Sequence, residues 1–483
     1  MRYLCLIFFI ISQHGSVFAL TRFNESPANQ INQQVTGSQY GTKVALNNRG
    51  EYVIAWISLD SSNHSVSVYA RTYDSSNAPL SDEFHITTAS APSSSYSNWT
   101  ALASIDYSMD MDDSGTIAFA LQVNENSSAS LGYFDKYGNN ISWQHVTSQG
   151  RVVDKPDLAV SSSGEALISW HYSYADGYFY VGARRYDQYG NPLGDEFLVS
   201  TGLAYSGSPA VSMLRNGKNA VIAWGGRPFW QLDGNNTGAN FNNIHFRLFD
   251  FQSQSESTPV LVNTDTQGVQ IKPDVAMSND GSFIIVWESR VGEKQYLDNY
   301  GGSYTWVYDS NLFARAFSRD GQALGDQFQI NDGKSSGVSV AANENGEFIF
   351  IWACESAELK EICGKKFDIS NTSLSELFVV HADTSGSHSS ASVSSDRKGN
   401  FIIAWQGDYS DGNNDIYAKK YEIASSDGVS ELDINVSDAE DIQDVEEIIN
   451  GNTSKGGSGV FSPYLVTLLI FYRLGFARRN KVR

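Results

Sequence analysis

Gly281–Trp287 reads GSFIIVW, a glycine followed by a run of apolar, largely β-branched residues that ends in tryptophan. Apolar runs of this length, bounded by turn residues, are typical of buried β-strands. The same pattern recurs along the chain, once with an extra residue (Gly217–Trp224) and once without the tryptophan (Gly115–Leu121). The remaining copies are Gly50–Trp56, Gly164–Trp170, Gly346–Trp352 and Gly399–Trp405. The spacing averages about 58 residues, which indicates a repeat architecture.

Each repeat carries further strand patterns around this central run. A small apolar pair precedes the glycine, as in Val44-Ala45, and a strand such as Val68–Tyr73 (VYARTY) follows the tryptophan. A turn and a short strand come next, as in Gly190–Val199 (GNPLGDEFLV). Four antiparallel strands repeated seven times predict an all-β fold, a seven-bladed β-propeller. A solenoid is the alternative, but it needs capping repeats and none is visible.

The N-terminal segment predicts how the ring closes. Asn29–Ala45 matches Val260–Ala276, with Ile31 and Val262 each 14 residues before the alanine. Residues 22–35 are therefore expected to supply the outer strand of the seventh blade, which would remove an exposed edge. Glu431–Val436 (ELDINV) is a competing candidate for that place.

Both ends of the chain read as targeting segments. Residues 1–19 combine Arg2, an apolar stretch and small residues before a cleavage point, which is the pattern of a secretory signal peptide. The propeller is expected over 20–423, and an acidic flexible linker over 424–455. The tail, 456–483, contains Gly456, Gly457, an apolar run over 460–471 and a basic end. Such a tail is expected to be held in the inner membrane with its basic end on the cytoplasmic side. A permanent transmembrane anchor and a GPI signal are the alternatives.

This tail resembles the GlyGly-CTERM sorting signal of Gram-negative bacteria. The resemblance implies transient inner-membrane contact, cleavage near Gly456 and Gly457 by a rhomboid-type protease, and delivery to the cell surface or the medium. The repeats resemble those of large bacterial surface and calcium-binding exoproteins, whose blades read like FVVAW followed by IYAQRFD. That second resemblance implies fold and location, and no fixed catalytic set.

The composition limits the classes of molecule that the chain is expected to bind. The 483 residues include 54 acidic and 33 basic side chains, for a net charge of −21. Nucleic acid is therefore not expected as a partner, because binding it requires Lys and Arg to neutralise phosphates. Cys5 lies in the signal peptide, so Cys354 and Cys363 remain and are expected to form a disulfide in an exported protein.

Aromatic residues gather in two segments expected to be long loops, Gly225–Asn243 and Glu288–Asn311. Flat aromatic faces beside Asn and Asp suit stacking on sugar rings, whereas packing of the loops on themselves as a lid is the alternative. The candidate ligand-binding residues are Phe229, Trp230, Tyr296, Tyr300, Tyr304, Trp306 and Tyr308.

Polar candidates are expected at the mouth of the central channel. Asp157 and Asp274 begin inner strands, while His171 and Glu288 directly follow strand tryptophans. These residues would form an acidic cluster of the glycosidase type, in which two carboxylates flank the bond, or simply line a solvated channel.

Calcium is a further candidate ligand, although no cofactor is required by the pattern. Oxygen-bearing side chains concentrate in a turn at Asp408, Asp411 and Asp415, and turn formation alone also explains them. The chain has no HExxH or GxSxG motif.

The sequence therefore favours a secreted or surface-exposed propeller that binds a polysaccharide or another surface protein. A carbohydrate-active enzyme, a glycosidase or a lyase, is the alternative, and a structural scaffold is a third.

Overall fold

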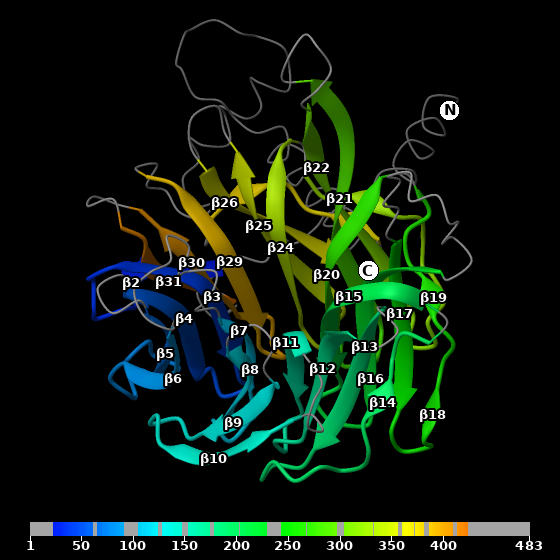
Figure 1. Cartoon of the computed structure of the whole chain (residues 1–483). Coiled ribbons are helices and arrows are strands. Elements are labelled where there is room, and N and C mark those ends of the chain that lie inside the picture. Colours follow the sequence, from blue (N-terminus) through cyan, green and yellow to red (C-terminus); the bar gives the residue numbers. More distant parts are fainter. Residues whose placement is uncertain are drawn as a thin grey trace, which may run out of the picture. The chain divides into compact units, whose positions relative to one another are not determined.

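In the computed structural model, all secondary structure among the described residues is β-strand (Figure 1). The structure describes residues 23–423 except 61–64, 91–104, 124–127, 147–152, 174–177, 202, 229–242, 267, 297–303, 332, 356–359, 371, 381–385 and 409–412. Since no helix occurs in this part of the chain, none there could cross a membrane. The strands form seven separate antiparallel sheets, the blades of a seven-bladed propeller.

Each blade has four successive layers from the channel outward, and in three blades the outermost layer consists of two short strands. The innermost strands are β3 (Ser38–Leu46), β7 (Ile105–Met111), β11 (Val153–Val160), β15 (Leu203–Met213), β20 (Val269–Met277), β24 (Ser335–Ala342) and β29 (His388–Ser395). The second strands are β4 (Tyr52–Asp60), β8 (Ile117–Val123), β12 (Ala166–Ser173), β16 (Asn219–Pro228), β21 (Phe283–Tyr296), β25 (Glu347–Glu355) and β30 (Phe401–Gly407).

The outer strands are shorter and less regular. The third strands are β5 (Ser65–Tyr73), β9 (Ser130–Phe134), β13 (Phe179–Tyr186), β17 (Asn243–Asp250), β22 (Tyr304–Phe317), β26 (Lys360–Asp368) and β31 (Asp415–Ile423). The outermost are β6 (Phe84–Ser90), β10 (Asn140–His145), β14 (Phe197–Leu198), β18 (Ser255–Glu256), β19 (Val260–Leu261), β23 (Phe328–Gln329), β27 (Ser373–Leu374) and β28 (Phe378–Val379). β1 (Phe23–Glu25) and β2 (Asn29–Gln30) complete the seventh blade.

The repeated tryptophans are the centre of the packing between blades. Six are fully buried: Trp56, Trp170, Trp224, Trp287, Trp352 and Trp405. Trp56, for example, packs with Ile402 and Ala404 of the seventh blade. The second blade has Leu121 in this place, and its neighbour Phe119 fills the space. Truncating one of these large buried side chains to alanine costs about 3 to 5 kcal/mol of stability.

The backbone conformation of the turn explains why glycine is repeated. In the second blade, the Asp112 carboxylate accepts the amides of Ser114 and Thr116, and Gly115 adopts φ 92° in the turn between the first two strands. A residue with a Cβ atom is strained at this φ, so glycine is favoured. Because the first two strands are antiparallel, these turns all lie at one end of the channel, and the innermost strands begin at the other.

The ring is closed by the N-terminal strands, as predicted. β1 and β2 both pair with β31, and Ile31 is 2% exposed, with its amide donating to the Ile416 carbonyl at 2.8 Å. Asn32 Oδ1 then accepts the Ile416 amide at 2.8 Å. Val262 and Asn263 make the same two bonds to Ile244 in the fourth blade. The alternative closing segment, 431–436, lies outside the described residues.

The predicted disulfide is also present. Cys354 of β25 and Cys363 of β26 are bonded, with 5.9 Å between their Cα atoms. The bond joins neighbouring strands of the sixth blade's central hairpin, beside its connection at 356–359.

Candidate functional site

The channel mouth is shaped by a bulge near the start of the innermost strands. In six of the seven blades the pairing of the first and second strands shifts register there, and β7 is the exception in the described part of the chain. The bulged residues have positive φ: Gly41, Lys155, Ser208, Lys272, Gly337 and Ser390. Four of the six are not glycine, and such residues cost on the order of 1 to 3 kcal/mol each in this conformation. The surrounding fold therefore imposes a strained rim.

A cavity of about 460 Å³ opens at this rim and is lined by residues of all seven innermost strands. Its ionisable lining consists of three lysines and four carboxylic acids, which determine what it can bind. They are Lys43, Lys155, Lys272, Asp106, Asp157, Asp274 and Glu288.

Asp157 and Asp274 hold neighbouring blades together. Asp157 accepts the hydroxyl of Ser108 at 2.6 Å and the amide of Val211 at 2.7 Å, one from each adjacent blade. Asp274 Oδ2 accepts the Val340 amide of the next blade at 2.9 Å. Adjacent innermost strands belong to different sheets, so their amides need side-chain acceptors. Both carboxylates therefore have a structural role at the mouth.

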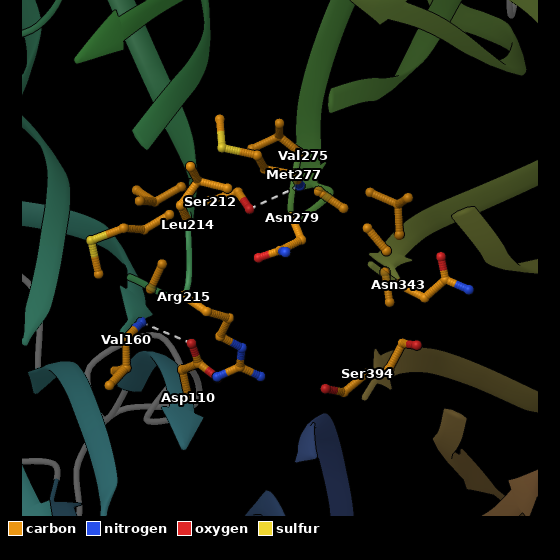
Figure 2. Close-up of a pocket in the computed structure, with 18 of the residues that line it drawn as sticks. Asp110, Val160, Ser212, Leu214, Arg215, Val275, Met277, Asn279, Asn343 and Ser394 are labelled. Atoms are coloured by element: carbon orange, nitrogen blue, oxygen red, sulfur yellow. Dashed lines mark hydrogen bonds between the residues drawn. The ribbon is translucent and has the colours of Figure 1, made fainter. Parts of the chain in front are cut away.

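Serines and one further aspartate repeat this contact around the channel. Figure 2 shows two examples, the Val160 amide donating to Asp110 at 2.8 Å and the Met277 amide donating to the Ser212 hydroxyl at 3.1 Å. The others are Val393 to Ser339, Val44 to Ser392 and Leu46 to Ser394. Among the described residues, such contacts span every junction except that of the first and second blades.

Arg215 crosses the opposite end of the channel. Its guanidinium lies beside Asp110 and donates to the carbonyls of Met111 at 3.2 Å and Leu46 at 3.3 Å, which belong to the second and first blades (Figure 2). The cavity at this end is smaller, about 200 Å³. The larger mouth is therefore the better candidate site.

Burial sets the protonation of these carboxyl groups. It raises the pKa of Asp157 and of Asp110, and it raises that of Asp274 to about 6, with a further contribution from the charge of Asp157. Glu288 behaves differently, because its carboxylate accepts the Gly337 amide at 3.0 Å and pairs with Lys272 at 3.3 Å and Arg290 at 2.7 Å. Burial acts to raise the pKa of Glu288, but these partners outweigh it and lower the pKa.

Asp106 and Asp154 form a carboxyl pair at the rim, across the junction of the second and third blades. Desolvation by the surrounding protein, and then the hydrogen bond and charge of Asp154, raise the pKa of Asp106 to about 6. The neighbouring His171 is the main cause that lowers the pKa of Asp154 to about 2, against the effect of burial. The strained Lys155 contributes its amide to Asp106. The pair therefore shares one proton near pH 5, and Asp106 can act as an acid.

His171 lies next to Asp154 of this pair. It lies directly opposite Asp154 in the β11–β12 pairing, with its Nδ1 3.7 Å from the Asp154 carboxylate. Its ring stacks on Phe179, with 5.1 Å between the ring centres.

The structure thus brings three of the four predicted channel residues, Asp157, Asp274 and Glu288, to one cavity, and places His171 beside its rim. The sequence reasoning missed Asp106, Asp154 and the lysines. One indication was present in the sequence: Lys-Pro-Asp occurs at 155–157 and again at 272–274, at the same place in two repeats.

The predicted loop over Glu288–Asn311 is wrong. The chain continues as a hairpin, with β21 extending to Tyr296 and β22 beginning at Tyr304, which lies opposite Tyr296. Trp306 and Tyr308 are therefore strand residues, paired with Lys294 and Gly292. Alternating aromatics extend the hydrogen-bonded ladder beyond the blade. Phe229, Trp230 and Tyr300 lie outside the described residues, so the ligand-binding role of the aromatic set stays a prediction.

Of the three calcium candidates, Asp408 and Asp415 lie within the described structure. Asp415 accepts the side-chain amide of Asn32 at 2.7 Å, Asp408 lies next to the undescribed turn, and Asp411 is within it. In the described residues no three His, Cys, Asp or Glu side chains are placed to share a metal ion.

Comparisons with known proteins give no family. No family model matches the sequence, and no curated protein matches it. Solved structures do resemble the fold. A Dyadobacter fermentans protein of unknown function is 11% identical, with a TM-score of 0.47 over 83% of this chain and 99% of its own.

Two of the similar structures are carbohydrate-active proteins. The α-L-arabinofuranosidase of Fusarium graminearum is 14% identical, with a TM-score of 0.44 over 70% of this chain and 96% of its own. The polysaccharide lyase Uly1 is 8% identical, with a TM-score of 0.48 over 79% of this chain and 89% of its own. These identities and scores are too low to say what this chain binds or does.

Proposed function

We propose that this chain is an exported carbohydrate-active enzyme that cleaves a polysaccharide at its channel mouth. The observation that carries the proposal is the Asp106–Asp154 pair, because two carboxyl groups with opposed pKa shifts beside an open cavity with ionisable side chains in its lining suit acid–base chemistry. The sequence alone favours a protein that binds a glycan without cleaving it, and the Asp106–Asp154 pair is the reason for preferring an enzyme.

The chemistry assigned to Asp106 is proton donation. When the glycosidic C–O bond breaks, Asp106 gives its proton to the leaving oxygen, and Asp154 holds that proton in place beforehand. Asp154 raises the pKa of Asp106, so the two carboxyl groups act directly on each other, whereas the two carboxylates of ordinary glycosidases are roughly 5 to 9.5 Å apart and have separate roles. The pair therefore serves as one acid–base unit, with His171 next to it.

Two bond-breaking routes are compatible with this unit and give different products. Hydrolysis adds water and yields a new reducing end. Elimination transfers a proton from carbon to the Asp106–Asp154 pair, which has given its own proton to the leaving oxygen. It yields a new reducing end together with a carbon–carbon double bond, which absorbs in the ultraviolet.

The test is product analysis after the full chain is incubated with a panel of neutral and acidic polysaccharides. Asp106→Asn is expected to lower kcat/KM by about a hundredfold or more, the usual contribution of a general acid. Asp187→Asn is the matched control, since Asp187 caps an exposed turn of the third blade through the amides of Tyr189 and Asn191. Full activity of Asp106→Asn would overturn the assignment.

Binding without turnover is the second candidate. It is favoured by Asp157, Asp274 and Glu288, whose carboxylate oxygens are all engaged by protein donors. Retention of a glycan by the wild-type chain with no products from any polysaccharide would support it.

The proposed function includes a location outside the cell. Export through residues 1–19 and cleavage near Gly456 and Gly457 would release the propeller to the surface or the medium. Mass measurement of both termini of the protein recovered from the producing cells and their medium tests this, and an intact 456–483 tail on all of it would contradict it.

A further inference from the structure

We infer that the channel mouth contains an anion site formed by Lys43, Lys155 and Lys272, and that it binds a carboxylate or sulfate group of a saccharide. As an anion site it stands by itself. As the determinant of the substrate class, an acidic polysaccharide, it rests on the proposed function.

The three lysines enter one cavity from alternate blades, the first, third and fifth. All three residues are exposed, in a chain whose net charge is −21. A basic ring within so acidic a protein provides a local attraction for anions that the surface as a whole lacks.

Among the described residues, Lys272 is the one lysine of the three that forms an ion pair with an acid of the cavity. Asp157 and Asp274 direct both carboxylate oxygens at protein hydroxyl and amide groups, and Asp106 is paired with Asp154. Glu288 is fully buried and engages Lys272 and Arg290. An entering anion therefore meets the ammonium groups of Lys43 and Lys155 without a direct ion pair, and that of Lys272 shared with Glu288.

Lys43 is the most informative of the three. It pairs with Ala55 at the place where Asp157 pairs with Ser169 in the third blade, so a lysine occupies the position of a blade-joining aspartate. Burial raises the pKa of Asp157 and of Asp274, and the charge of Lys43 acts against that rise; all three residues line the same cavity. No hydrogen bond or ion pair of the Lys43 or Lys155 ammonium occurs among the described residues.

The backbone supports a role for the side chains at 155 and 272. Both residues have positive φ, 49° and 50°, where the first and sixth blades use Gly41 and Gly337. Glycine adopts this conformation without strain, whereas lysine is strained there. Lysine at these two places therefore adds charge to the mouth at a cost in stability.

The experiment is calorimetric titration of the full chain with inorganic sulfate, glucuronate, a sulfated oligosaccharide and glucose. We expect binding of the anions, weakening with added salt, and none of glucose. Each of Lys43→Gln, Lys155→Gln and Lys272→Gln should weaken anion binding about tenfold, and Lys43→Arg should retain it. Lys218→Gln, at an exposed turn on the opposite end, is the control and should bind as the wild type.

The four ligands distinguish a charged sugar from a free ion as the anion that binds, and the variants distinguish the anion site from the proposed enzyme activity. Tighter binding of glucuronate or the sulfated oligosaccharide than of sulfate assigns the site to a charged sugar, while equal binding assigns it to the free ion. No anion binding, or lysine variants equal to Lys218→Gln, would overturn the site. Anion binding without turnover of any glycan would support the anion site and contradict the proposed enzyme activity. Turnover of a neutral glycan that does not depend on the lysines would support the enzyme activity and contradict the anion site as the determinant of its substrate.

Discussion

Asp274→Asn tests how the blades are joined at the mouth. Asp274 accepts the amides of Val275 and Val340, both at 2.9 Å, and burial raises its pKa to about 6. A free aspartate has a pKa near 4, so the folded protein binds this proton more tightly than the unfolded chain does. Protonated Asp274 therefore makes the protein more stable in acid, and this contribution to the unfolding free energy is lost as the pH rises from about 4 through 6.

The size of the effect follows from the same two values. A difference of about two pH units corresponds to about 3 kcal/mol of unfolding free energy over the whole titration, of which about 2 kcal/mol falls between pH 4 and pH 7. Asparagine does not titrate, so the variant should lack this part of the pH dependence. It retains one acceptor oxygen for one of the two amides and leaves the other facing an NH₂ group, which costs about 1 to 3 kcal/mol.

Urea unfolding at several pH values between 4 and 7 measures the difference. Asp187→Asn is the control of opposite sign: burial acts to raise the pKa of Asp187, but the hydrogen bonds from Asn191 and Tyr189 outweigh it and lower the pKa. Its contribution is therefore present at neutral pH and lost in acid. If the pH dependence of Asp274→Asn differed from that of the wild type by less than about 1 kcal/mol, the assignment of Asp274 as a buried inter-blade acceptor would be refuted.

The other predictions address closure, the disulfide, strain and the hairpin. Ile31→Ala should lower the unfolding free energy by about 2 to 5 kcal/mol, because Ile31 is buried in the closing blade, and an unchanged melt would contradict that closure. Cys354→Ser should cost about 2 to 3 kcal/mol for a loop this short, and thiols that alkylate without reductant would contradict the bond. Lys155→Gly should leave stability equal or up to about 1 kcal/mol higher while weakening anion binding about tenfold, and a lower melting temperature would contradict the strain. Trp306→Ala should weaken saccharide binding by about 1 to 3 kcal/mol at unchanged melting temperature, and unchanged affinity would remove the aromatic hairpin from the site.

Local patterns were enough to predict the fold. The glycine–tryptophan run specifies a turn with positive φ and a strand buried between two blades, and both depend on residues adjacent in sequence. Closure was predictable for the same reason, because Ile31-Asn32 repeats the pattern of Val262-Asn263, and both pairs make the same bonds.

The site was only partly predictable, because its contacts cross from one blade to the next. That Asp106 meets Asp154 depends on the rim bulge at Lys155, and the pattern of apolar and polar residues does not encode a bulge. The hairpin was missed because Gly292 and the glycines at 301–302 favour a loop, although the alternation of Tyr304, Trp306 and Tyr308 was an available strand pattern.

The dependence of kcat/KM on pH for polysaccharide cleavage, in wild type and Asp106→Asn, tests the central claim most directly. If the Asp106–Asp154 pair supplies the proton, the wild-type activity should fall as the pH rises through about 6, where Asp106 loses its proton. Asp106→Asn should have little activity at any pH. Cleavage that continues undiminished above pH 7, or that survives in Asp106→Asn with the wild-type profile, would contradict the assignment of the channel mouth as the active site.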